Sequence, residues 1–462
     1  MATPPFRRIL VAGRGEIAVR VIRAAAALGI ESVAAVSEAD RESLAARLAT
    51  AAVCIGPAAA AKSYLNAEAL VMAARGRGCE AIHPGYGFLS ERASFARMCE
   101  EAGLVFIGPS PQAIATMGDK LAAIRTAEAA GVARVPGSDR IASLEEARVA
   151  AQRVGYPVLL KASAGGGGRG MRIVEEEAEL PAAMESAARE AAAAFGDPSL
   201  YLEKFIRRAR HIEIQILGDA SGNVIHLGER DCSTQRRHQK LIEESPAPRL
   251  DAKRRQELAE GALRLAREVG YRGAGTIEFV YDEEAGAAYF LEMNTRIQVE
   301  HPVTEMVTGQ DLVEAQIRIA AGEPLGISQE DVELKGHAIE CRINAEDDAR
   351  GFLPRPGRIA LWKAPTGPGI RVDTHCYGGY SVPPFYDSLL AKLIVHAADR
   401  EAAIAGMAEA LSRFEVAGIP TTIPFHRRVL DEVDFRQGRI TTRWVDERFL
   451  GHGMGSAFET FP

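Results

Sequence analysis

Several features that mark secreted, zinc-binding or membrane proteins are missing from this sequence of 462 residues. Its cysteines do not form the close pairs of a zinc site or a disulfide framework; they are Cys54, Cys79, Cys99, Cys232, Cys341 and Cys376. No uninterrupted apolar run approaches the roughly 20 residues that cross a bilayer, and no apolar signal core precedes the first predicted strand. We therefore expect a protein of the reducing cytoplasm, without a membrane segment.

An excess of basic residues is also missing. Lysine and arginine number 55 against 62 aspartate and glutamate residues, so the formal net charge is -7 and the sequence pI is about 5.9. A nucleic-acid binder would carry a basic surface, so we expect no nucleic-acid partner. The basic cluster at 236–240 is an exception, and it suits a small anion better than a polynucleotide.

Length and pattern together predict several domains. A chain of this size exceeds one hydrophobic core, so two or three domains are expected. In the first part, apolar strand patterns alternate with alanine-rich helical patterns, as in a parallel βαβ sheet. The predicted strands lie at 8–12, 31–37, 52–55, 81–83 and 104–107, with a helix at 16–28, and the sheet ends near residue 118.

A glycine-rich turn after the first strand leaves one alternative function open. Residues 13–18, Gly-Arg-Gly-Glu-Ile-Ala, fit the dinucleotide-binding fingerprint, and Glu38 or Asp40 follows at a tolerable distance. Read alone, this turn predicts an NAD-dependent dehydrogenase. A dehydrogenase gives no reason, however, for the polar groups farther along the chain.

The most informative stretch is 292–301, in which polar residues occupy every even position. Glu292, Asn294, Arg296, Gln298 and Glu300 are separated by mainly apolar residues, a strand pattern whose polar groups face one way. A solvated edge strand is the alternative. At about 3.3 Å per residue, a straight strand would hold the two glutamates about 26 Å apart. That is too far for one small-molecule site, so we expect the chain to bend near Arg296.

Oxygen-bearing side chains in two predicted strands indicate a magnesium site. Glu292 and Asn294 offer hard oxygen atoms two residues apart, which Mg²⁺ accepts when it also holds phosphates. Glu278 alternates with apolar neighbours in a predicted strand at 275–280; in the interior it would need a partner such as a metal. The mixed sheet that carries these strands, together with a strand at 212–216, would form one wall of the site, with Arg296 binding an anion.

The segment 157–171 combines a hydrophobic strand, Lys161 and four successive glycines. Glycines at 165–168 would allow backbone N–H groups to close around a polyphosphate. The spacing lacks the Gly-Lys-Ser/Thr ending of a Walker loop, and another strand pattern follows in place of a helix. A flexible hairpin tip is the alternative, but Lys161 and the downstream carboxylates favour a phosphate loop.

Nine segments of the chain together resemble biotin carboxylase, an ATP-grasp enzyme. They are MGDK (117–120), KASAGGGGRGMRIV (161–174), EKFI (203–206), HIEIQ (211–215), ERDCSTQRRHQKLIEESPAP (229–248), EMNTRIQVEHPVTEM (292–306), CRINAED (341–347), HPGYGFLSE (83–91) and FYDSLLAKLI (385–394). The resemblance extends over nearly the whole chain, and chance does not produce so many long motifs in this order.

The resemblance implies a fold of α/β and α+β type. A Rossmann-like N-terminal domain would cover 1–118, an ATP-grasp domain 119–330, and a biotin carboxylase C-terminal domain 335–450. A mobile lid would cover about 134–205. In this family the Rossmann-like domain does not hold NAD.

The resemblance also implies the reaction and its binding groups. ATP and bicarbonate would form carboxyphosphate, which breaks down to CO₂ and phosphate, and the deprotonated ring nitrogen of biotin would capture the CO₂. The implied ATP contacts are Lys120, Lys161, Gly167, Gly168, Glu203, Lys204, Phe205, Ile206, His211, Gln235, His238, Glu278 and Glu292. Mg²⁺ or Mn²⁺ would be held by Glu278, Glu292 and Asn294.

Bicarbonate and biotin would lie beyond the phosphates. Bicarbonate would be held by Lys240, Arg296, Gln298 and the backbone of Val299. Glu300 would be the general base, Arg342 would stabilise the biotin enolate, and Tyr86 would lie near the biotin pocket. The implied catalytic set is Arg296, Glu300, Lys240 and Arg342. A protein that merely senses biotin or nucleotide would need this site without its reactive groups, and those groups are present.

The partners are implied less directly. The sequence has no Met-Lys-Met biotin-attachment motif, so we expect biotin to arrive on a separate biotin carboxyl carrier protein, with carboxyltransferase subunits as further partners and a homodimer as the assembly. The family commonly has Asn at Gly13, His at Ala45 and an acidic pair at Thr50 and Ala51, which bears on subunit contacts and pathway. Acetyl-CoA is the expected acceptor, in fatty acid synthesis; propionyl-CoA, pyruvate, another acyl-CoA and urea stay open.

Overall fold

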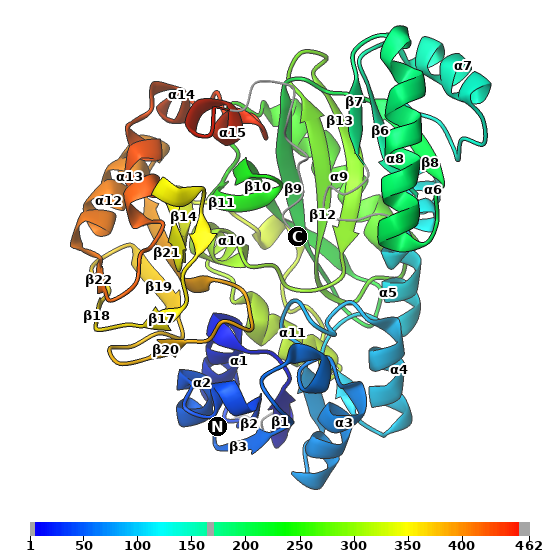
Figure 1. Cartoon of the computed structure of the whole chain (residues 1–462). Helices are drawn as coiled ribbons and strands as arrows, with labels where there is room; N and C mark the ends of the chain where they lie inside the picture. Colours follow the sequence, from blue (N-terminus) through cyan, green and yellow to red (C-terminus); the bar gives the residue numbers. More distant parts are fainter. Residues whose placement is uncertain (1–4, 164–170, 452–462) are drawn as a thin grey trace.

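The protein is described by a computed structural model, which covers residues 5–163 and 171–451. Figure 1 shows a small N-terminal domain at the bottom, a small helix-flanked unit at the upper right and the C-terminal region at the left, with a large sheet between them. The overall class is mixed α/β, as predicted.

The N-terminal domain is a five-stranded parallel sheet in the order β3-β2-β1-β4-β5. The side chains of Ile9, Leu10 and Val11 in β1 are fully buried, as expected where helices cover both faces of a sheet. The predicted βαβ pattern is confirmed. The strands are β1 (Arg8–Val11), β2 (Glu31–Val36), β3 (Ala51–Cys54), β4 (Ala81–His83) and β5 (Val105–Phe106), and the helices are α1 (Gly15–Ala27), α2 (Leu44–Leu48), α3 (Ala67–Gly76), α4 (Ala93–Glu101) and α5 (Pro111–Gly118).

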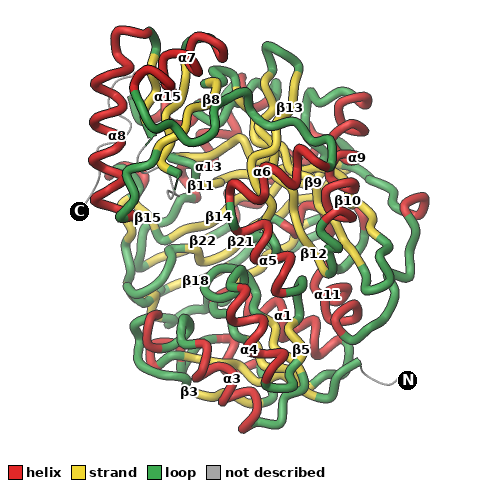
Figure 2. The backbone as a smooth tube through the Cα atoms, turned by 90° about the vertical axis from the view of Figure 1, so that its right-hand side faces the viewer, coloured by secondary structure: helices red, strands yellow, loops and turns green. Residues whose placement is uncertain are grey.

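A second, smaller unit follows α6 (Lys120–Ala129) and corresponds to the segment predicted as a lid, a name that is kept for it below. Its three-stranded antiparallel sheet has the order β7-β6-β8, and two helices flank it. Helix α7 is capped at its N-terminus by Ser143, whose hydroxyl accepts from Glu146 N (3.2 Å), and at its C-terminus by Gly155, with a positive φ of 80°. The elements are α7 (Leu144–Val154), β6 (Val158–Ala162), β7 (Arg172–Val174), α8 (Leu180–Phe195) and β8 (Leu200–Lys204). Figure 2 shows α7, α8 and β8 at the end of the molecule opposite the N-terminal domain.

The large sheet has eight strands in the order β13-β12-β9-β10-β11-β14-β21-β19. Every neighbouring pair in it is antiparallel. The prediction of a mixed sheet is therefore wrong, because tight hairpins connect β9 to β10, β10 to β11 and β12 to β13. The strands are β9 (Ala209–Gly218), β10 (Val224–Arg236), β11 (Gln239–Ser245), β12 (Gly273–Asp282), β13 (Ala287–Asn294), β14 (His337–Asn344), β19 (Ile370–Thr374) and β21 (Leu389–Ala397).

Helices and short ladders complete the outer layer. Helix α9 packs on β9 and β10, and an apolar core shared with the N-terminal domain includes Leu217, Ile225 and Ile297. The helices are α9 (Ala252–Glu268), α10 (His301–Thr308), α11 (Leu312–Ala320), α12 (Arg400–Arg413), α13 (Ile423–Asp431), α14 (Val433–Arg436) and α15 (Trp444–Phe449), and the short strands are β15 (Glu346–Asp347), β16 (Leu353–Pro354), β17 (Gly357–Arg358), β18 (Leu361–Lys363), β20 (Ser381–Val382) and β22 (Glu415–Ala417).

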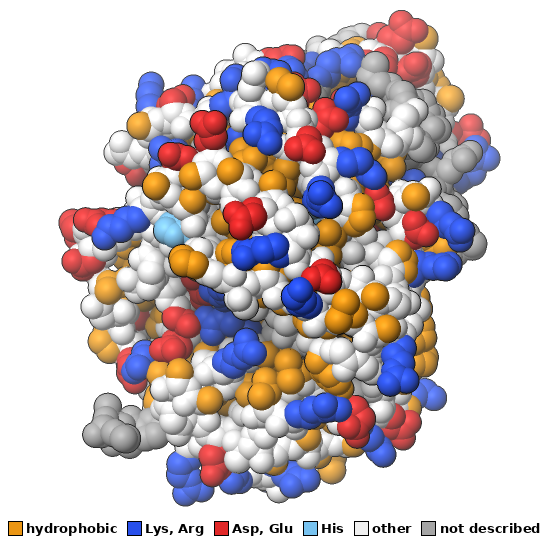
Figure 3. Space-filling model, turned by 90° about the vertical axis from the view of Figure 1, so that its left-hand side faces the viewer, with side chains coloured by type: hydrophobic (Ala, Val, Ile, Leu, Met, Phe, Trp, Pro, Cys, Tyr) orange, Lys and Arg blue, Asp and Glu red, His pale blue; other side chains and the backbone are white. Residues whose placement is uncertain are grey.

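The surface drawn in Figure 3 mixes side chains of every kind. Acidic, basic and apolar side chains are interspersed on the described part of this face. Among the residues that the structure describes, each helix is either too short or too polar to cross a bilayer.

Candidate active site

A cavity of about 1100 Å³ lies where the lid, the large sheet, the N-terminal domain and the C-terminal region meet. Every predicted site residue within the described ranges lines it: Tyr86, Lys120, Lys161, Glu203, Lys204, Phe205, Ile206, His211, Gln235, His238, Lys240, Glu278, Glu292, Asn294, Arg296, Gln298, Val299, Glu300 and Arg342. Gly167 and Gly168 lie outside the described residues. The fold thus brings together residues that are up to 256 positions apart, from Tyr86 to Arg342.

Strand register places carboxylates on one face of the sheet. Glu278 lies opposite Glu213 of β9 on one side and opposite Glu292 of β13 on the other, and directly opposed residues share a face. Desolvation within the cavity and the neighbouring Glu278 raise the pKa of Glu292. A divalent cation would relieve this repulsion, and the oxygens of Glu278, Glu292 and Asn294 are the donors that Mg²⁺ prefers.

The chain turns sharply where the alternating polar pattern continues. β13 ends at Asn294, and residues 295–300 form an irregular turn before α10 begins at His301. The predicted bend is confirmed, but the strand interpretation is wrong beyond Asn294. Ile297 in this turn is fully buried in the interdomain core, so tertiary packing produces the alternation there.

Lys240 lies at the centre of the carboxylates. Its Nζ is 2.6 Å from Glu213 Oε2, 2.8 Å from Glu278 Oε1 and 2.5 Å from Glu300 Oε1. Burial would lower the pKa of Lys240, but these three carboxylates outweigh it and raise the pKa well above its usual value. The ammonium group of Lys240 is therefore a permanent positive charge in the wall of the cavity.

Glu300 lies between two cations, Lys240 and Arg342. Its second carboxylate oxygen lies 3.0 Å from Arg342 Nη2. Burial would raise the pKa of Glu300, but Lys240 and Arg342 lower it below its usual value. Arg342 Nε also donates to Glu243 Oε1 (2.5 Å), and burial raises the pKa of Glu243 to about 7.

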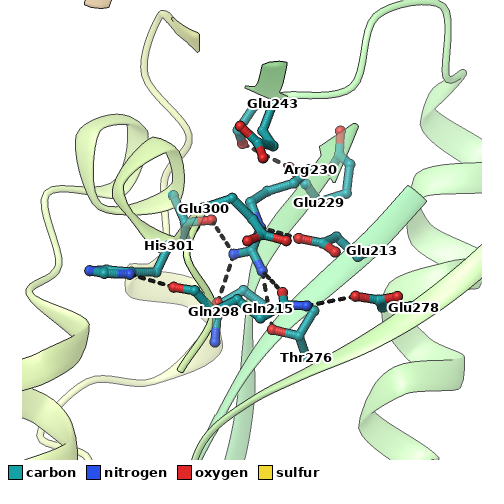
Figure 4. Close-up of polar contacts among 12 residues, drawn as sticks. Glu213, Gln215, Glu229, Arg230, Glu243, Thr276, Glu278, Gln298, Glu300 and His301 are labelled. Atoms are coloured by element: carbon teal, nitrogen blue, oxygen red, sulfur yellow. Dashed lines mark hydrogen bonds and ion pairs between the residues drawn. The ribbon is translucent and has the colours of Figure 1, made fainter. Parts of the chain in front are cut away.

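Arg230, which sequence reasoning did not single out, is fully buried and binds polar side chains next to the site (Figure 4). Its buried guanidinium donates to Glu213 Oε1 (2.5 Å) and Gln298 Oε1 (2.6 Å). The remaining acceptors are Gln215 (2.7 Å), Thr304 (2.9 Å) and Thr276 (3.1 Å). Its place inside the matched segment 229–248 was the only sequence signal.

The N-terminal domain supplies Glu91, a second residue that was missed. Its carboxylate accepts from Arg296 Nε (2.9 Å) and from the backbone N–H of Thr295 (3.1 Å). Arg296 Nη2 donates in turn to Asn294 Oδ1 (2.7 Å). Glu91, the last residue of the matched segment 83–91, therefore orients the guanidinium of Arg296, which is predicted to bind an anion.

The lid and the β10–β11 hairpin carry further basic side chains, at the other end of the cavity from Lys240 and Arg342. Lys161 on β6 pairs with Glu203 on β8, and Lys204 donates to the backbone carbonyls of Gly155 (2.8 Å) and Tyr156 (3.0 Å). His238 and Arg237 form the hairpin turn with positive φ values of 65° and 46°. Such turns favour Asn and Gly, and non-glycine residues there are strained, which is common at functional sites.

His211 lies between these two ends. Its Nε2 is 3.1 Å from Glu278 Oε2. Burial would lower the pKa of His211, but Glu278 and Glu213 together outweigh it and raise the pKa to about 9. The cavity thus has cations at both ends and carboxylates between them, an arrangement suited to binding anions around a divalent metal.

Comparison with known proteins agrees with this geometry. Three family models match: "Biotin carboxylase, N-terminal domain" over residues 5–114, "Carbamoyl-phosphate synthase L chain, ATP binding domain" over 119–328, and "Biotin carboxylase C-terminal domain" over 340–447. The chain is 53% identical over 442 residues to biotin carboxylase 1 of Bacillus subtilis, covering 96% of this chain and 98% of that protein.

Solved structures match over the same length. A biotin carboxylase complex with β,γ-ATP from Campylobacter jejuni has a TM-score of 0.92 at 49% identity, covering 96% of this chain and 99% of that one. The biotin carboxylase domain dimer of Hydrogenobacter thermophilus 2-oxoglutarate carboxylase, in complex with MgADP, ADP and bicarbonate, has a TM-score of 0.90 at 52% identity, covering 96% and 97%. The chain therefore belongs to the biotin carboxylase family of ATP-dependent ligases.

Proposed function

We propose that this chain carboxylates biotin on a separate carrier protein, using ATP and bicarbonate. The observation that supports this most is the position of Glu300 between Lys240 (2.5 Å) and Arg342 (3.0 Å). A carboxylate with a lowered pKa is ionised at neutral pH and can accept the bicarbonate proton. Lys240 would hold the bicarbonate anion as its oxygen attacks the γ-phosphorus of ATP, giving carboxyphosphate and ADP.

The remaining site residues take roles that fit their positions. Phosphates would lie by Lys120, Lys161 and His238, and Gly167 and Gly168, which lie outside the described residues, are further predicted ATP contacts. Glu278, Glu292 and Asn294 would hold Mg²⁺ or Mn²⁺, which neutralises phosphate charge when bound. The rest of the ATP pocket would be Glu203, Lys204, Phe205, Ile206, His211 and Gln235, and Arg296, Gln298 and Val299 would complete the bicarbonate site.

Biotin would bind beside Tyr86 and Arg342, which both line the cavity. Arg342 would stabilise the enolate that forms when the ring nitrogen loses its proton, and Tyr86, whose hydroxyl donates to the buried Glu16, would border the ring. We further propose a homodimer in the cytoplasm that works with a carrier and carboxyltransferase subunits, and acetyl-CoA as the final acceptor. The Hydrogenobacter relative is part of a 2-oxoglutarate carboxylase, so similar chains serve different acceptors. The partner proteins would set the acceptor, and isolation of the co-purifying carrier would identify it.

Nucleotide binding should slow amide exchange in the lid. The described part of the unit at 134–205 has its own small sheet and core, so we expect it to move as a body over bound ATP. Hydrogen exchange should be measured with and without ATP and Mg²⁺, with the five-stranded N-terminal sheet as the internal control. Equal lid exchange in both conditions would mean that the glycine run is an ordinary turn.

A biotinylated carrier should stimulate ATP cleavage by orders of magnitude more than free biotin. Free biotin loses translational and rotational freedom that a docked carrier recovers through its own contacts. The measurement is bicarbonate-dependent phosphate release with biotinylated carrier, unmodified carrier and free biotin at matched concentration. Equal stimulation by both carrier forms, or none above free biotin, would contradict the proposal and point to a small-molecule acceptor.

A further inference from the structure

Lys392 is a lysine without exposed surface in the middle of β21. A buried ammonium is destabilising unless oxygens satisfy it. Its Nζ lies 3.0 Å from Glu16 Oε1 on α1 and 3.8 Å from Asp373 Oδ2 on β19, and it donates to the carbonyl of Val299 (2.8 Å). One side chain of the C-terminal region therefore joins the N-terminal domain to the turn at 295–300.

His301, the first residue of α10, makes a similar contact at the preceding carbonyl. Its Nδ1 lies 2.6 Å from Gln298 O, as Figure 4 shows. A carbonyl oxygen can only accept, so Nδ1 carries the proton. Burial, together with the charge of Lys392, holds the pKa of His301 well below its usual value. The ring is therefore neutral, with a fixed tautomer.

These two contacts set the orientation of consecutive peptide units. Both units are trans, and in a planar trans peptide the C=O and N–H groups point in opposite directions. The contact at Gln298 O therefore directs the N–H of Val299, and the contact at Val299 O directs the N–H of Glu300. Val299 and Glu300 line the cavity, whereas Lys392 and His301 do not.

The turn has no regular secondary structure that would fix it otherwise. Glu91 accepts from the N–H of Thr295, Ile297 is packed in the interdomain core, and Arg230 binds the side chain of Gln298. Among the hydrogen bonds of the described residues, the carbonyl of Gln298 accepts from the side chain of His301, and the carbonyl of Val299 accepts from the side chain of Lys392. The one further contact that the described residues make to these two carbonyls is a long one, from His301 N to Gln298 O (3.4 Å).

We propose that His301 and Lys392 are positioning residues for bicarbonate, which aim the Val299 N–H and the Glu300 carboxylate by fixing these two peptide units. The inference rests on the proposed function, in which Val299 and Glu300 contact bicarbonate. Because neither side chain reaches the cavity, its loss acts through the turn. Misplacement by about 1 Å costs on the order of 10²-fold in rate, and nucleotide groups outside the turn stay in place.

The test compares His301→Leu with His301→Asn. Leucine has no donor, whereas the asparagine amide can place an N–H near the position of Nδ1. We expect kcat/KM for bicarbonate to fall by about 10²-fold in His301→Leu, with the KM for ATP within about twofold, and to recover by about tenfold or more in His301→Asn. A purely structural role would move both KM values together and would give no such recovery.

A second pair of variants covers the lysine. Lys392→Met combined with Glu16→Gln removes the ammonium without leaving Glu16 as an unpaired carboxylate, and it should show the same bicarbonate-specific loss. Arg400→Met is the matched control, because Arg400 is a partly buried cation bound to Glu244 and to carbonyls of Phe435 and Arg436. It should lower the Tm and leave the bicarbonate KM unchanged.

The outcomes separate the two proposals. Wild-type protein without bicarbonate-dependent ATP cleavage would overturn the proposed function and this inference with it. Wild-type protein with that activity, beside a folded His301→Leu variant whose bicarbonate KM and kcat are unchanged, would overturn the inference alone. If both histidine variants fail to fold, the Lys392→Met/Glu16→Gln variant decides by the same measurement.

Discussion

Bicarbonate-dependent ATP cleavage should be lost in Glu300→Gln while ATP still binds. Glutamine keeps the shape of the side chain between Lys240 and Arg342 but cannot accept the bicarbonate proton. Loss of a general base typically costs about 10²–10⁴-fold in rate. Phosphate release gives the rate, and calorimetry should give an ATP Kd within about threefold of wild type, because Glu300 is not among the predicted ATP contacts.

Lys240→Ala should abolish the same activity, for a different reason. The variant removes the cation that would hold bicarbonate and leaves Glu213, Glu278 and Glu300 facing one another. Breaking a buried ion pair in this way costs about 3–5 kcal/mol of stability, so its Tm should be checked first. Lys363→Met is the control, since Lys363 is exposed and pairs with Glu415 away from the cavity. Equal failure of ATP binding in both site variants would make these residues structural or nucleotide-binding groups.

Glu292→Gln should slow ATP turnover at least about 100-fold, the scale of losing one major electrostatic contact. The change removes the charge of a carboxylate that lies opposite Glu278 on the adjacent strand. With one charge fewer, the site should hold Mg²⁺ more weakly and stabilise the phosphate oxygens less. Turnover should be measured across a titration of Mg²⁺ up to saturation.

Glu283→Gln provides the comparison for this metal-site variant. Glu283 lies in the loop joining β12 to β13, does not line the cavity, and pairs with Arg208 (2.8 Å) and with Arg210 (3.6 Å). The same loss of charge on the same hairpin should leave turnover nearly unchanged. Wild-type turnover of Glu292→Gln at saturating Mg²⁺ would refute its assignment as a metal ligand.

Local patterns were enough to predict the parts of the molecule whose geometry is local. The N-terminal sheet is an example, because the hydrophobic patterns of buried strands such as β1 and helices such as α1 identify these elements without knowledge of their tertiary contacts. The matched segments did the same for the cavity, bringing Tyr86 and Arg342 into one list before any distance was known. Their chemical roles remain predictions.

Long-range contacts set the features that sequence reasoning missed. Whether β9 and β12 run parallel or antiparallel depends on their connections, so the large sheet was assigned wrongly as mixed. The alternation at 292–300 looked like one strand because Ile297 is buried by another domain. Arg230 and Lys392 were overlooked because a charged residue reveals its burial only through partners far along the chain, such as Gln298 and Glu16.

The large sheet crosses from the ATP-grasp part into the C-terminal region without a break. β11, which carries Lys240, pairs with β14, which carries Arg342. A cut near residue 336 would leave each fragment with a bare strand edge, the kind of surface that recruits other chains and aggregates. The ATP-grasp part and the C-terminal region therefore cannot be exchanged as separate modules during evolution or engineering. A larger multienzyme assembly would have to acquire or exchange this unit whole.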